Sequence, residues 1–248
     1  MEEECSQWEN LAKELEERDR FYQAGNQYRQ AASCYLERAA EMSRKAAENF
    51  HIQAEVSSEA NDHDMAATAY FEAATQYRQM DEYDTALTLF ENAAEQALQV
   101  GKTETAAQSY LWAAFSCHRL GNKEYFLTCA ENMANLYSKA AEEAFREAKA
   151  ERAVMDLSLA AMGLATINRT SEAQEKIAKA RMVIDRTIWD WLRTILDFAE
   201  ALANRRLSDA SRLLRRFEQE ETIQELMDAC LSIVEETIES EPLTSTSQ

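Results

Sequence analysis

Few residues of this chain have the types and spacing that chemistry requires. The three histidines, His51, His63 and His118, do not form the i, i+4 pairs of helical zinc sites. Cys117 precedes His118 directly, but adjacent side chains on a helix point in different directions. The abundant carboxylates are typical of a solvated helical surface. No phosphate-binding loop, nucleophile elbow or dinucleotide motif occurs. We therefore expect no enzyme, no metal site and no cofactor.

The cysteines and the start of the chain indicate a compartment. Five cysteines, an odd number, are widely scattered without a C-x-x-C spacing, which predicts buried thiols on helices and no disulfide framework. They are Cys5, Cys34, Cys117, Cys129 and Cys230. No run approaches the ~18 apolar residues of a membrane span, and the start lacks the regions of a secretory signal. A cytoplasmic protein is expected.

The composition predicts that helices position any site. Among 248 residues there are four glycines and one proline, Pro242, too few for the turns that sheets need. With 46% hydrophobic and 29% charged residues the chain is globular. The net charge of −19 argues against nucleic acid as the main partner and favours a basic one.

A repeated apolar stripe organises the chain. It has the helical spacing i, i+4, i+7, i+8, i+11. The four copies are Ala24, Tyr28, Ala31, Ala32, Tyr35; Ala66, Tyr70, Ala73, Ala74, Tyr77; Ala106, Tyr110, Ala113, Ala114, Cys117; and Ala153, Leu157, Ala160, Ala161, Leu164. The small alanine pair lets a neighbouring helix approach closely, while the larger residues fill the gaps between helices. Four copies at this period predict a helical solenoid.

Between the copies there is room for a second helix, so each repeat is a helical hairpin. Turn or capping pairs separate the helices: Asn61-Asp62, Asp81-Glu82, Gly101-Lys102, Gly121-Asn122 and Asn168-Arg169. The predicted helices are 3–18, 20–37, 41–59, 63–79, 83–99, 103–119, 123–148, 151–167, 170–185, 187–203, 207–217 and 221–239. The fold class is all-α: a right-handed, tetratricopeptide-like (TPR-like) solenoid over residues 1–186, a C-terminal helical bundle over 187–240 that caps it, and a disordered tail over 241–248.

Charge is segregated near the C-terminus. Five arginines cluster around Asp209, and residues 217–248 hold nine acidic and no basic side chains. The arginines are Arg205, Arg206, Arg212, Arg215 and Arg216. This polarity indicates either a binding surface or, as the favoured interpretation, arginines paired with nearby carboxylates beside a solvated acidic helix.

Two segments carry a resemblance to a known family. His63 to Gly101 and Arg193 to Ser240, with Thr237-Ile238 near the end, resemble the soluble attachment proteins (SNAPs) for the N-ethylmaleimide-sensitive fusion ATPase (NSF). The tripeptide Ala24 to Asn26 is similar to a recurring one in that family. The resemblance implies an adaptor that binds assembled SNARE four-helix bundles and recruits an NSF-type AAA+ ATPase for their disassembly in vesicle fusion. It implies at most peripheral contact with membranes.

The resemblance also implies site residues. ATPase contacts fall on acidic residues, with Asp197 and Glu200 on a Leu-rich helix and Glu239 and Glu241 near the end, followed by Leu243 in place of a terminal leucine. The family's basic SNARE-contacting positions are Gln108 and Ser158 here. From the residues themselves, the basic candidates for an acidic partner bundle are Arg119, Lys123, Lys149, Arg152 and Arg169.

Other classes fit less well. The main alternative is a generic TPR-like interaction scaffold with unrelated cargo. Phosphopeptide adaptors of the 14-3-3 class would need convergent Lys, Arg and Tyr. A di-iron helical enzyme would need two Glu-x-x-His pairs, and the sequence holds one, Glu48 to His51.

Overall fold

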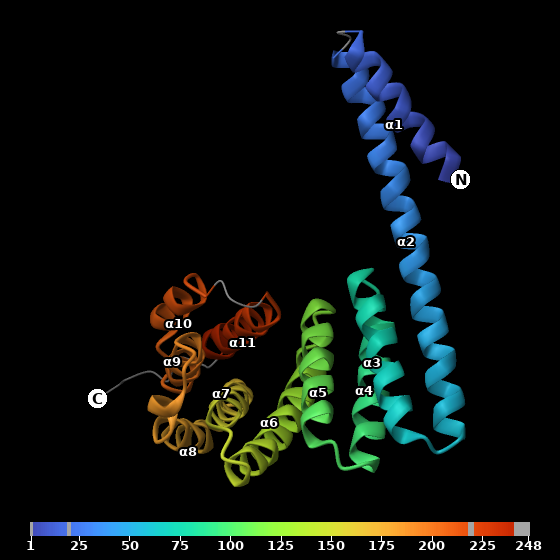
Figure 1. The fold of residues 1–248 in the computed structure, drawn as a ribbon. Helices are drawn as coiled ribbons and strands as arrows, with labels where there is room; N and C mark the ends of the chain where they lie inside the picture. Colours follow the sequence, from blue (N-terminus) through green and yellow to red (C-terminus); the bar gives the residue numbers. More distant parts are fainter. Residues whose placement is uncertain (1, 19–20, 218–220, 241–248) are drawn as a thin grey trace.

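The computed structural model describes residues 2–18, 21–217 and 221–240, and these residues form helices and short connectors (Figure 1). The helices are α1 (Glu2–Glu17), α2 (Phe21–Glu59), α3 (His63–Gln79), α4 (Tyr83–Gln99), α5 (Thr103–Arg119), α6 (Lys123–Arg146), α7 (Ala150–Thr166), α8 (Thr170–Arg181), the 3-10 turn η1 (Ile184–Arg186), α9 (Trp191–Ala203), α10 (Leu207–Leu214) and α11 (Glu221–Ser240). Consecutive helices pack as antiparallel hairpins that stack into a curved array. The all-α solenoid is confirmed.

One connector geometry recurs between these helices. A residue with a left-handed φ occurs at four connectors spaced twenty residues apart, at Asn61, Asp81, Gly101 and Gly121. The same conformation recurs later in the chain at Ala148, Asn168 and Arg205. In each case the N–H of the next residue donates to a carbonyl five residues earlier, as in Asp62 to Ser57 and Asn122 to Cys117. This bond satisfies a carbonyl at the end of one helix while the following helix starts. All five predicted turn pairs are confirmed, and two more lie at Ala148-Lys149 and Arg205-Arg206.

The repeat stripe forms the core in three of its four copies. The members in α3, α5 and α7 pack against neighbouring helices, and the alanine pair is fully buried in each. Close approach is greatest at Gly163 of α7, where a Cβ would lie 2.8 Å from the carbonyl oxygen of Ala130 in α6. α6 has 24 residues against 17 in α3 and α5, and seven extra residues are about two helical turns. The extension therefore keeps the same side of α6 toward α7.

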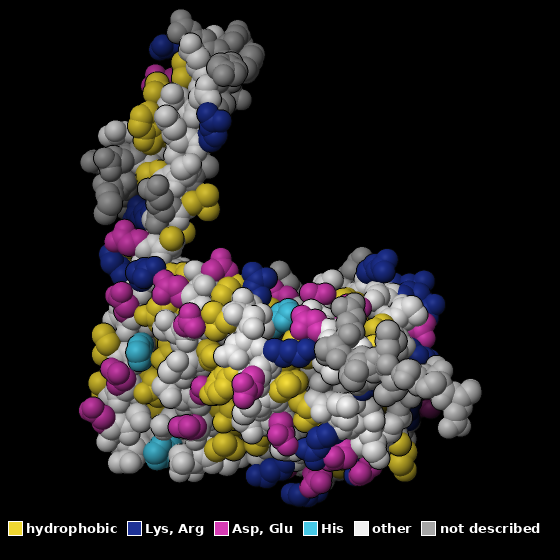
Figure 2. All heavy atoms as spheres, turned by 180° about the vertical axis from the view of Figure 1, so that it is seen from behind, with side chains coloured by type: hydrophobic (Ala, Val, Ile, Leu, Met, Phe, Trp, Pro, Cys, Tyr) yellow, Lys and Arg dark blue, Asp and Glu magenta, His cyan; other side chains and the backbone are white. Residues whose placement is uncertain are grey.

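The first copy of the stripe behaves differently because α2 is one continuous helix of 39 residues. The predicted break between residues 37 and 41 is wrong. Arg38, Ala39 and Ala40 are strong helix formers, and the segment contains no Gly, Pro or capping residue that would end a helix. The first half of α2 and α1 consequently project as an arm beyond the ends of α3 and α4 (Figure 1), and the arm stands clear of the body when the molecule is seen from behind (Figure 2). Tyr28 and Tyr35 are 37% and 42% exposed on it.

A disulfide joins Cys5 of α1 to Cys34 of α2, so the expectation of five free thiols is wrong for this pair. The antiparallel return of α1 along α2 brings together two residues that are 29 apart in sequence. That juxtaposition depends on the hairpin and not on local spacing. The buried side chains of Cys5, Ala12 and Ala31 show that the two helices approach closely. Cys117, Cys129 and Cys230 are buried free thiols, as expected.

The C-terminal helices close the array and also return across it. α9 packs on α7 and α8, α10 follows, and α11 contacts α7 and α5. Glu225 of α11 pairs with Arg78 of α3 at 3.5 Å, and Arg78 lies 4.0 Å above the Trp112 ring. The division at residue 186 stays a prediction, and the predicted tail over 241–248 lies outside the described residues.

Although α2 is long, neither it nor another helix in the described ranges carries a stretch apolar enough to cross a bilayer.

Candidate functional site

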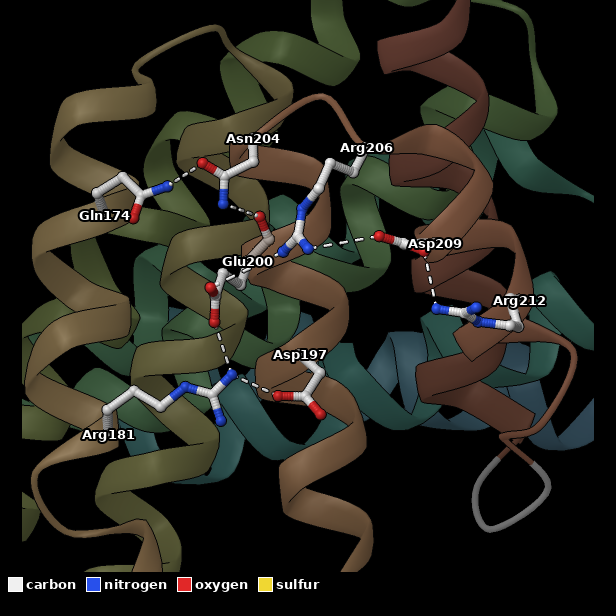
Figure 3. Close-up of polar contacts among 8 residues, drawn as sticks. All are labelled: Gln174, Arg181, Asp197, Glu200, Asn204, Arg206, Asp209 and Arg212. Atoms are coloured by element: carbon white, nitrogen blue, oxygen red, sulfur yellow. Dashed lines mark hydrogen bonds and ion pairs between the residues drawn. The ribbon is translucent and has the colours of Figure 1, made fainter.

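The two acidic residues on the Leu-rich helix lie in a cluster of alternating charges formed by α8, α9 and α10. α9 carries Asp197 and Glu200 three residues apart, so both project from one side of the helix, and its apolar side buries Ile195, Leu196 and Phe198. Figure 3 shows both carboxylates directed at Arg181, the last residue of α8. We call Arg181, Asp197, Glu200, Arg206, Asp209 and Arg212 the charged cluster.

The charged cluster is a continuous chain of ion pairs. Arg181 Nη2 donates to Asp197 Oδ1 and, at 2.6 Å, to Glu200 Oε2. Arg206 lies 3.8 Å from the other oxygen of Glu200 and 3.4 Å from Asp209. Arg212 donates to Asp209 at 2.8 Å. Three cations and three anions therefore neutralise one another, which supports the favoured interpretation for Arg206 and Arg212.

Supporting bonds hold α9 in place at its C-terminal end. Asn204 donates from Nδ2 to the Glu200 carbonyl at 2.8 Å and accepts from Gln174 of α8 at 2.9 Å (Figure 3). These bonds tie the end of α9 to α8. The position of Glu200 is thus fixed by the backbone of the hairpin as well as by its ion pairs.

The charged cluster remains accessible to a partner. The side chains of Asp197 and Glu200 are 44% and 32% exposed, and the cluster surrounds a shallow cavity of about 310 Å³. Burial acts to lower the pKa of Arg181, but the bonds to Glu200 and Asp197 outweigh it and the pKa is raised. Exposed ion pairs contribute little to folding. An incoming basic group would have to compete with Arg181 for both carboxylates.

The side chains of the remaining candidates for the ATPase contact are not described. Glu239 lies in the last turn of α11, and nothing is described of its side chain. Glu241 and Leu243 lie outside the described residues.

The five basic candidates are not brought together. Arg119, Lys123 and Arg169 lie at connectors that follow α5 and α7, whereas Lys149 and Arg152 lie at the start of α7, the opposite end of the hairpins. Each has an intramolecular partner. Arg119 lies 5.3 Å from the Tyr83 ring, Lys123 pairs with Glu236 of α11 and Lys149 with Glu147; Arg152 pairs with Glu104 and Arg169 with Glu131 and Glu172.

The two positions aligned with basic contacts in the resemblance differ in access. Gln108 is exposed on α5, but Ser158 is fully buried in α7, where its hydroxyl donates to the Val154 carbonyl at 2.7 Å. Ser158 therefore cannot contact a partner in this fold.

The inner side of the array is covered more than the repeat pattern suggested. α5 is buried without interruption from Leu111 to Cys117, because α11 lies over its otherwise open side. The sequence indicates this cover in α7, which α11 also contacts, because Leu157 to Ile167 contains no charged residue. A helix that is apolar all round is covered on every side.

Across the described ranges, no group of three or more His, Cys, Asp and Glu side chains is arranged to hold a metal ion. Stacked helical hairpins with paired, partly exposed charges define a helical-repeat protein of the kind that presents surfaces to other proteins. The model of the soluble NSF attachment protein (SNAP) family matches residues 2–222, and the chain belongs to this family. Members of this family are adaptors rather than enzymes. A comparison with curated proteins gives no match.

Proposed function

We propose that this protein binds assembled SNARE four-helix bundles and recruits an NSF-type AAA+ ATPase that disassembles them in vesicle trafficking. The observation that carries the proposal is the pair Asp197 and Glu200, which lies partly exposed on α9 within the part of the chain that the SNAP family model covers. The site of action is the cytoplasm, with at most peripheral membrane contact.

The ATPase-binding role falls on the charged cluster. A basic domain of the ATPase would share or take over the carboxylates that Arg181 now holds. Such exchange of exposed ion pairs costs little, and charge complementarity mainly accelerates the encounter. Glu239, Glu241 and Leu243 remain further candidates for the same contact. The overall charge of −19 acts in the same direction.

The ATPase contact is tested by Asp197→Asn with Glu200→Gln, which removes charge while keeping size. We expect recruitment of the ATPase to a preassembled SNARE bundle to fall about tenfold or more, while bundle binding is unchanged. The matched control is Glu131→Gln with Glu172→Gln, because Arg169 also bridges two carboxylates there. Equal recruitment by the two double variants would remove Asp197 and Glu200 from the site.

The cargo-binding role is tested by comparing the assembled bundle with its separate helices at low and physiological salt. Preference for the assembled bundle supports the adaptor. Binding to neither would favour the alternative, a generic TPR-like scaffold with unrelated cargo. That alternative has an observation in its favour: all five basic candidates already have partners within the chain.

A further inference from the structure

A second recess, distinct from the charged cluster, lies between the start of α7 and the link that enters α9. We call it the tryptophan groove. It has a volume of about 780 Å³, within the range of ligand-binding pockets. Its principal lining residues are Glu104 of α5, Arg152, Met155 and Asp156 of α7, Trp189 in the link before α9 and Trp191 at the start of α9.

The polar wall of the groove contains an incompletely satisfied acid. Asp156 is 2% exposed, and its Oδ2 atom has no hydrogen-bond partner. The nearest cation is Arg152, whose Nε lies 3.6 Å away and is itself without a hydrogen bond. Arg152 is held instead by Glu104 at 2.6 Å. A buried carboxylate oxygen left in this state is costly unless another donor reaches it.

The charge around the groove decides which kind of group would fit. The lining includes three acids, Glu104, Glu151 and Asp156, against two bases, Lys149 and Arg152. The Lys149 ammonium is already 2.8 Å from Glu147. A carboxylate oxygen has two lone pairs and can accept from Arg152 and from a second donor. A further cation therefore reduces the negative excess of the groove, whereas an anion would increase it.

The apolar wall supplies a second recognition element for a cation. Trp189 and Trp191 are stacked, with ring centroids 5.6 Å apart and an interplanar angle of 15°. Trp189 is 48% exposed, and the residue before it, Ile188, is 81% exposed. Tryptophan faces attract guanidinium and ammonium groups. Exposed Trp beside other large apolar side chains is typical of protein-binding surfaces.

We infer that the tryptophan groove binds a basic side chain, an arginine or a lysine, presented by a partner polypeptide. The cation packs against the face of Trp189 and donates to Asp156, while apolar neighbours of the basic residue cover Ile188. This inference does not depend on the proposed function, because neither SNAREs nor the ATPase enters it.

The test uses a short peptide, acetyl-Ala-Arg-Ala-amide, titrated into the full chain while the tryptophan indole N–H signals are followed by NMR. Citrulline in place of the arginine gives a neutral probe of nearly the same shape. Of the four tryptophans, Trp8 in the arm and Trp112 under α11 serve as internal references. We expect Trp189 and Trp191 to shift with the arginine peptide, and about tenfold weaker binding of the citrulline peptide.

Variants separate recognition from folding. Asp156→Asn and the more exposed Glu151→Gln should each weaken binding of the arginine peptide, and Asp156→Asn should bring its affinity close to that of the citrulline peptide. Glu172→Gln on α8, outside the groove and the charged cluster, should have no effect. Equal affinity for the two peptides, undiminished binding by both groove variants, or tighter binding of a glutamate peptide would each overturn the inference.

Discussion

Asp156 is a buried carboxylate whose protonation links the folded state to pH near neutrality. Burial is the main cause that raises its pKa to about 7, the Glu104 carboxylate on α5 adds to the rise, and Arg152 opposes it. Glu143 on α6 raises the pKa further. The folded value exceeds the ordinary value of 3.8, so between these values the native state binds more protons than the unfolded state. Stability from this group is therefore lost as pH rises through 7.

The variant Asp156→Asn removes this titration. The difference in free energy of unfolding between Asp156→Asn and wild type should shift in favour of the variant by on the order of 1–3 kcal/mol when the pH is raised from about 5 to about 8. Urea unfolding at the two pH values measures the difference, with Asp209→Asn as control. Parallel behaviour of wild type and Asp156→Asn would contradict the buried acid. The same titration should make the arginine peptide bind more tightly at the higher pH.

At the scale of elements, exchanging Ala and Gly at the left-handed connector positions should change the stability of the protein in opposite directions. Ala148 has φ of 57° and Gly121 of 70°, and nothing lies within 4 Å of a Cβ added at Gly121. A left-handed residue other than Gly costs about 1–2 kcal/mol, partly offset by the greater freedom of unfolded Gly. Ala148→Gly should therefore stabilise the protein by about 0.5–1 kcal/mol, and Gly121→Ala should destabilise it similarly. Thermal melting would show whether both changes have these signs.

At the contact between α6 and α7, glycine is required for lack of space and not for its backbone conformation. Gly163→Ala improves helix propensity by about 1 kcal/mol, but the new methyl would lie 2.8 Å from the Ala130 carbonyl oxygen, which a side-chain rotation cannot move. Overpacking of this kind costs about 1–3 kcal/mol, so a net loss of stability is expected. The melting temperature of Gly163→Ala should fall, and an unchanged or higher value would show that the helices separate freely.

The sequence allowed most element boundaries to be predicted, and the failures have physical causes. Connectors with Asn, Asp or Gly in the left-handed position were found, whereas Ala148 and Arg205 give no turn signal although their backbones are the same. The C-terminal part of the last predicted solenoid helix is instead the separate turn η1. Asp197 and Glu200 could be placed on one helical face, but Arg181 as their shared partner depends on how α8 packs on α9.

At the scale of the whole molecule, the disulfide acts on the arm alone. Bridging residues 29 apart contributes about 3–4 kcal/mol to docking of α1 on α2 by limiting the unfolded chain. Cys5→Ser with Cys34→Ser should expose α1 to limited proteolysis while the melting temperature of the stacked repeats stays unchanged. Wild type under reducing conditions should behave identically. Loss of the main melting transition in the double variant would mean that the arm supports the solenoid.

The unbroken α2 gives the arm a mechanical property that stacked hairpins lack. Thirty-nine residues at 1.5 Å each make a rod of about 58 Å. α1 braces one half of this rod, and α3 anchors the other. Because α2 is helical throughout and its one glycine, Gly25, lies near its start, the rod between the arm and the first repeat contains neither Gly nor Pro, and the arm is held at a set distance and direction from that repeat. The length of α2 therefore sets the distance between the first repeat and any partner that contacts the tip of the arm.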